Sequence, residues 1–181
     1  GVAGGELEIV DVRPDQMVNV IARLRDMGMQ ITAGDQTMHV VADRRLRAID
    51  VPTLPYPGIA TDYKPLIITM LSVAEGTGIV TENIYPGRFR YVEELIRLGA
   101  DIKTSGHHAV VRGVTRLSGA PVRAHDIRAG AALVVAAMVA PEALCDLVAR
   151  CDGFLFIGGS DYPPAWYGEQ PHPETHVMNP A

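Results

Sequence analysis

The chain has 181 residues, a net charge of −5 at pH 7, 48% hydrophobic residues and 20% charged residues. This length and composition predict one globular domain or slightly more, and they exclude wholesale disorder. The acidic balance argues against a general nucleic-acid binder, which is usually basic, so we expect no nucleic-acid partner.

Cysteine usage and hydropathy indicate the cellular setting. Cys145 and Cys151 are too few for a disulfide scaffold, and no metal-ligand spacing surrounds them. No signal peptide opens the chain, and the longest apolar run, 131–140, is too short to span a bilayer. We therefore expect a cytoplasmic protein with no membrane contact, metal or cofactor. Because the chain begins with Gly1 rather than Met, we expect a processed product or a fragment.

Alternating and helical spacings of apolar residues predict the elements of the first third. In chain order they are a strand over 6–12, a helix that begins near Arg13 and ends at Gly28, a hairpin over 30–42 and a short strand over 48–51. A loop rich in proline follows, from Pro52 to Gly58.

The same spacings predict the elements that follow this loop. They are a helix over 62–74, a strand over 78–84, a helix over 89–98 with Val92, Leu95, Ile96 and Leu98 facing inward, a hairpin formed by 101–104 and 109–112, a strand that ends with Val122 and Ala124, and a helix over 126–140. Residues 66–73 and 131–140 are apolar nearly all round, which predicts that both helices are completely buried.

An internal repeat organises these elements. Residues 24–31 match 95–102, 71 positions later, and residues 60–64 match 124–128, 64 positions later. The chain therefore repeats a strand–helix–strand–helix–hairpin unit. It holds one complete copy, the tail of a copy before it and the head of a copy after it. This order of elements indicates an α/β fold.

The most informative stretch is 60–85. It contains Thr61 and Asp62 before the apolar helix, a Gly-Thr-Gly turn at 76–78, and a strand that ends in Thr81-Glu82-Asn83. It resembles the UDP-N-acetylglucosamine enolpyruvyl transferases (1-carboxyvinyltransferases) of peptidoglycan synthesis. The resemblance covers about residues 5–140 and is most specific over 61–99. It implies an inside-out α/β barrel of repeated βαβαββ units, present here as a partial domain over 1–140.

The resemblance also implies a reaction and its residues. Enzymes of this family transfer the enolpyruvyl group of phosphoenolpyruvate to the 3-hydroxyl of UDP-N-acetylglucosamine and release phosphate. Asp62 matches the residue that takes the hydroxyl proton, with Thr61 beside it. Arg88 and Arg128 match arginines near the substrates, and Ile84 matches a position whose backbone touches the sugar nucleotide.

Each of these residues also has a plainer interpretation. Asp62 or Thr61 could simply cap the helix. Arg128 could form a surface ion pair with Asp126, which would contribute little. Ile84 could be an ordinary core residue. Spacing alone leaves these alternatives open.

Several parts of the resembled family are missing from this chain, including the acid that protonates phosphoenolpyruvate. We therefore expect the isolated chain to be inactive and to need the missing domain or a partner chain, and we expect it to self-associate through uncovered helix faces. The alternatives are a shikimate-pathway enolpyruvyl transferase and a non-catalytic interaction fragment.

Residues 141–181 predict a separate segment. An apolar run at 154–157 leads to Gly158 and Gly159. This pattern resembles the early part of class I glutamine-amidotransferase-like hydrolases that cut γ-glutamyl bonds. The resemblance implies a foreign tail, which could also cover the exposed helix faces. A γ-glutamyl hydrolase function would need a nucleophile further downstream, and this chain contains none in the expected turn.

Overall fold

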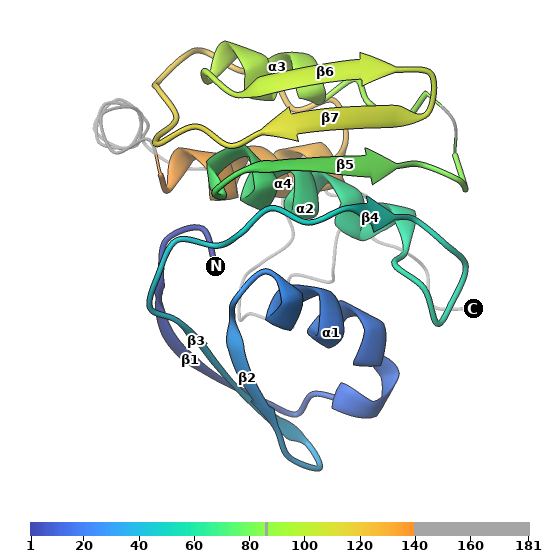
Figure 1. Ribbon diagram of the computed structural model, residues 1–181, viewed down its shortest axis with the longest axis vertical. Helices are drawn as coiled ribbons and strands as arrows, with labels where there is room; N and C mark the ends of the chain where they lie inside the picture. Colours follow the sequence, from blue (N-terminus) through green and yellow to red (C-terminus); the bar gives the residue numbers. More distant parts are fainter. Residues whose placement is uncertain (86, 140–181) are drawn as a thin grey trace, which may run out of the picture.

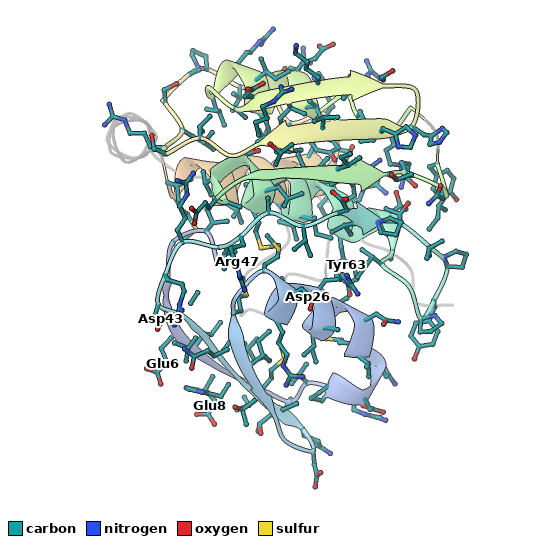
Figure 2. The ribbon with its side chains drawn as sticks, in the orientation of Figure 1. Glu6, Glu8, Asp26, Asp43, Arg47 and Tyr63 are labelled. Carbon is teal, nitrogen blue, oxygen red and sulfur yellow. The ribbon has the colours of Figure 1, made fainter. Side chains whose placement is uncertain are left out.

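The computed structural model describes residues 1–85 and 87–139, which form two sheets with helices packed against them (Figure 1). The smaller sheet has the strand order β1-β3-β2, and both strand pairs are antiparallel. Its part of the chain comprises β1 (Gly5–Val10), a 3₁₀ turn η1 (Pro14–Gln16), α1 (Val18–Asp26), β2 (Gln30–Ala33) and β3 (Thr37–Ala42). Glu6 and Glu8 of β1 lie exposed on the outer side of this sheet (Figure 2).

The larger sheet has the order β4-β5-β7-β6. β4 and β5 are parallel, and the other two pairs are antiparallel. Its elements are β4 (Val51–Pro52), a 3₁₀ turn η2 (Thr61–Tyr63), α2 (Lys64–Val73), β5 (Thr77–Thr81), α3 (Val92–Arg97), β6 (Asp101–Ser105) and β7 (His108–Arg112). The helix α4 (Ile127–Ala137) follows and packs beside α2.

The predicted internal repeat is confirmed by the topology. The order β1-β3-β2 around α1 recurs as β5-β7-β6 around α3. Both helices end in the same way, because Gly28 and Gly99 have positive φ values of 107° and 90°. The N–H of Met29 donates to the carbonyl of Leu24, as that of Ala100 donates to Leu95. This pattern closes a helix where glycine avoids the steric cost of a left-handed turn.

The helices cover one face of the larger sheet and leave the other face open to solvent (Figure 1). Side chains alternate accordingly: Val80 and Val111 are fully buried, whereas Ile79 is 39% exposed. Burying the sheet face and α2 stabilises the fold by about 1.5–3 kcal/mol per large apolar side chain. Helices inside and a sheet outside agree with the predicted inside-out arrangement.

Predictions about two strands and one side chain need correction. Residues 113–126 contain no strand, so the one expected to end with Val122 and Ala124 does not form. Ile96 is 45% exposed rather than inward, because α3 has only six residues and buries a single face. The strand expected over 48–51 is only the two-residue β4, since it pairs with β5 over two positions.

The two apolar helices differ in how far they are buried. α2 is enclosed, with Ile68 and Leu71 at 0% exposure, as predicted. α4 is not, because it contacts α2 on one side and exposes Ile127, Val134 and Met138 on the other, at 60%, 44% and 53%. Complete burial of α4 was therefore a wrong prediction, and the uncovered helix face expected of a partial domain is present on α4 but not on α2. Within residues 1–85 and 87–139, no helix combines the length and the apolar character needed to cross a membrane.

Candidate functional site

Asp62 lies at the middle of η2, the 3₁₀ turn that leads into α2. Its side chain is 64% exposed. The N-cap of η2 is Ala60 and that of α2 is Tyr63, and neither end has a side-chain cap, so neither Thr61 nor Asp62 acts as the helix cap that spacing alone allowed. Among residues 1–85 and 87–139, no backbone group donates a hydrogen bond to this carboxylate, which faces the side chains of two arginines.

Two arginines that are distant in sequence approach this carboxylate. Arg128 Nη1 lies 2.7 Å from Asp62 Oδ1, and Arg88 Nη1 lies 3.5 Å from the same oxygen. The two guanidinium groups are about one-third exposed. The structure thus brings together the three charged residues that sequence analysis selected, from η2, the β5–α3 loop and the start of α4.

Asp126 holds Arg128 in place. It caps α4, and its Oδ1 accepts from the backbone N–H groups of Arg128 and Ala129 at 2.9 and 3.0 Å. The same oxygen lies 3.2 Å from Arg128 Nε. The predicted ion pair between Arg128 and Asp126 therefore forms, but Arg128 reaches Asp62 at the same time.

The charges shift the pKa values of this cluster. Hydrogen bonds to Asp62 and Asp126 raise the pKa of the Arg128 guanidinium, so it stays charged. Partial burial raises the pKa of Asp126, but the N–H of Ala129 and the Arg128 guanidinium outweigh it and lower that pKa overall. The result is an exposed carboxylate flanked by two permanent cations, which suits chemistry on an anionic substrate.

Thr61 and Ile84 take supporting positions. Thr61 is buried, and its hydroxyl donates to Glu82 Oε2 at 2.7 Å, so this hydroxyl points inward. Ile84 is half-buried in the loop that follows β5, and its N–H donates to Glu82 Oε1 at 2.8 Å. The predicted contacts of these two residues with a sugar nucleotide stay predictions.

Sequence analysis missed Glu82 and Lys64 as parts of this site. Both side chains are 0% exposed, and Lys64 Nζ lies 2.6 Å from Glu82 Oε2. Nζ also lies 4.1 Å from the centre of the Phe89 ring. A lysine in the first turn of a helix is ordinary in sequence, so only its burial in the folded chain shows that it needs a partner.

Burial and ion pairing shift the pKa values of Lys64 and Glu82 in opposite directions. Burial lowers the pKa of the Lys64 ammonium from its ordinary value, while Glu82 opposes the shift. Burial raises the pKa of the Glu82 carboxyl, but Lys64, Thr61, Thr53 and the N–H of Tyr85 together bring it down to about 2. Glu82 is thus an anion at neutral pH. Among residues 1–85 and 87–139, no cluster of His, Cys, Asp or Glu could hold a metal ion.

Comparison with known proteins identifies the family. Residues 1–149 match the family model described as EPSP synthase (3-phosphoshikimate 1-carboxyvinyltransferase). A UDP-N-acetylglucosamine 1-carboxyvinyltransferase of Mycolicibacterium paratuberculosis is 48% identical over 136 residues, which cover 75% of this chain and 33% of that protein. The Nocardia farcinica protein of the same name is 49% identical over 136 residues, with coverages of 75% and 32%.

A solved structure agrees with these sequence matches. The enolpyruvyl transferase NikO from Streptomyces tendae superposes with a TM-score of 0.68 at 25% identity, over 77% of this chain and 35% of that one. The chain spans about a third of the length of these relatives. Its repeated βαβαββ topology and the match over residues 1–149 lead to one conclusion: the chain belongs to the EPSP synthase family of enolpyruvyl (carboxyvinyl) transferases.

Proposed function

We propose that this chain forms one part of a UDP-N-acetylglucosamine 1-carboxyvinyltransferase. The reaction adds the 3-hydroxyl of the sugar nucleotide to C2 of phosphoenolpyruvate and then eliminates phosphate. The observation that carries the proposal is the exposed Asp62 carboxylate with Arg128 at 2.7 Å and Arg88 at 3.5 Å. Residues 1–140 form the partial transferase domain, and 141–181 form a separate segment that lies outside the described residues.

Asp62 is the group that accepts the proton of the attacking hydroxyl. A general base must have an accessible oxygen, and the Asp62 side chain is 64% exposed. Arg88 and Arg128 flank the same place and can bind phosphate or carboxylate groups of the substrates. The acid that protonates the methylene carbon of phosphoenolpyruvate is supplied by a part of the enzyme outside this chain.

The sugar nucleotide is favoured over shikimate 3-phosphate as acceptor. The Mycolicibacterium and Nocardia relatives, at 48% and 49% identity, are named for UDP-N-acetylglucosamine. Calorimetric titration of a complete enzyme with each acceptor separates the two substrates.

A chimera tests the proposal. Residues 1–139 replace the matched segment of the Mycolicibacterium paratuberculosis relative, and phosphate release is measured with both substrates. We expect the chimera to release phosphate and the 181-residue chain to release none, because catalysis needs several groups positioned together. A folded but inactive chimera, or steady release by the isolated chain that Asp62→Asn abolishes, would contradict this interpretation.

A binding role is favoured by one further observation. Ile127, Ala131, Val134 and Met138 form an exposed apolar stripe along α4. Exposed apolar faces promote association. We expect the 181-residue chain to self-associate in light scattering, and Val134→Lys to shift it toward the monomer. Leu7→Lys, at a residue 60% exposed on β1, is the control and should leave association unchanged. A chain that is monomeric at high concentration would rule out this role.

A further inference from the structure

Glu82 is the most connected buried side chain near the candidate site. Its Oε1 accepts from Thr53 Oγ1 at 2.7 Å and from the N–H groups of Ile84 and Tyr85 at 2.8 and 3.0 Å. Its Oε2 accepts from Thr61 Oγ1 at 2.7 Å and lies 2.6 Å from Lys64 Nζ. The carboxylate therefore joins three stretches of chain, around Thr53, over 61–64 and over 82–85, at a point with no solvent exposure.

These contacts surround the residues proposed for chemistry. Thr61 and Lys64 lie one position before and two positions after Asp62. Ile84 and Tyr85 begin the loop that carries Arg88, whose guanidinium lies 4.3 Å from the centre of the Tyr85 ring. Thr53 adds the segment after β4, and it also accepts from the N–H of Asn83 at 2.9 Å. One carboxylate thus fastens both the turn of Asp62 and the loop of Arg88.

We propose that Glu82 is a positioning residue that fixes the Asp62 turn and the Arg88 loop relative to each other. It acts through Thr61 and Lys64 on one side and through the amides of Ile84 and Tyr85 on the other. Its effect on catalysis rests on the function proposed above, whereas its effect on the two segments does not.

A glutamine cannot reproduce this arrangement. A carboxylate offers about four acceptor sites, and here five donors converge on them. In Glu82→Gln one oxygen becomes an NH₂ group, which must face either Lys64 or the two amides. Hydrogen bonds to a charged acceptor are the stronger ones, so the loss should loosen both segments.

Amide hydrogen exchange on the 181-residue chain tests the positioning role directly. In Glu82→Gln, the amides of Ile84 and Tyr85 should exchange roughly tenfold faster or more, because both donate directly to the Glu82 carboxylate. The amides of Tyr63 and Lys64, which donate to Ala60 and Thr61, should accelerate with them. Acceleration at Ile84 and Tyr85 with Tyr63 and Lys64 unchanged would overturn the proposal.

A second variant serves if Glu82→Gln does not fold. Thr61→Val keeps the β-branched shape and removes only the hydroxyl that donates to Glu82 Oε2. It should accelerate exchange at Tyr63 and Lys64 and leave Met27, at the end of α1, unchanged. No change at Tyr63 and Lys64 would likewise reject the link between Glu82 and the Asp62 turn.

Kinetics of the chimera test the consequence for catalysis. Glu82→Gln should lower kcat by roughly tenfold to a hundredfold, because a displacement of about 1 Å can cost that much. The Michaelis constant for UDP-N-acetylglucosamine should change by less than about threefold, since the Glu82 side chain is fully buried and presents no surface to a ligand.

Arg45→Gln is the matched control. Arg45 contacts the C-terminal end of α2, whereas Glu82 contacts Lys64 at its N-terminal end. Arg45 donates to the carbonyls of Val73, Ala74 and Val114, so its loss also destabilises α2. Its kcat should stay within about twofold of the parent at a comparable loss of melting temperature. An equal loss of kcat in both variants would reject the positioning role. An inactive parent chimera would instead reject the proposed function, and the exchange result would stand by itself.

Discussion

Asp62→Asn should lower the turnover of the chimera by about 10²–10⁴, the usual effect of losing a general base. Asparagine keeps the size of the side chain and can still accept a hydrogen bond from Arg128, which now lies 2.7 Å from Oδ1. It cannot take a proton from the sugar hydroxyl. The variant should therefore fold and bind UDP-N-acetylglucosamine with nearly unchanged affinity, measured by calorimetric titration alongside phosphate release.

Asp43→Asn is the matched control for this experiment. Asp43 is also an exposed carboxylate beside an arginine, with Arg44 Nε at 3.1 Å, and it lies just after β3, the central strand of the smaller sheet (Figure 2). Its loss should leave turnover unchanged. Normal turnover in Asp62→Asn would remove Asp62 from the role of base. An equal loss in both variants would point to a general effect of charge.

Lys64→Met should destabilise the 181-residue chain by about 3–5 kcal/mol, because it leaves a buried carboxylate without its counter-ion. Methionine fits the apolar surroundings and keeps contact with Phe89, so the loss comes from the charge rather than from a cavity. Four neutral donors still reach the Glu82 carboxylate, so we expect a destabilisation toward the lower end of that range. Urea denaturation followed by circular dichroism measures it.

The double variant Lys64→Met with Glu82→Gln separates pairing from packing. Removing both charges should lower the free energy of unfolding by clearly less than the sum of the two single variants. The reason is that each single variant leaves one buried ion without a partner, whereas the double variant leaves none. If the stability losses of the two single variants add up in the double variant, or if Lys64→Met lowers stability by less than about 1 kcal/mol, then Lys64 and Glu82 do not depend on each other in the folded state.

The local sequence determined most of the elements and the repeat that relates them. Residues 24–31 and 95–102 share a helix end and a hairpin start because the same short-range signals, a glycine after an apolar helix, act in both. Resemblance to the family also selected Asp62, Arg88 and Arg128, which the structure places around one oxygen.

Burial on particular faces could not be determined in this way. Ile96 and the outer stripe of α4 are as apolar as their buried neighbours, so composition alone predicted an inward position for all of them. Whether such a side chain is covered depends on which element packs against it, and only the tertiary structure contains that information.

The same reason explains why Glu82 and Lys64 escaped detection. They stand 18 positions apart, in a strand end and a helix start that each look ordinary in isolation. By itself, the sequence determined the α/β class and the repeated unit, and its resemblance to the family selected the candidate base with its two arginines. Only the tertiary structure decided that a fully buried ion pair joins the turn of that base to the arginine loop. Pairing at 2.6 Å arises when the folded chain brings distant segments together and removes water from both charges.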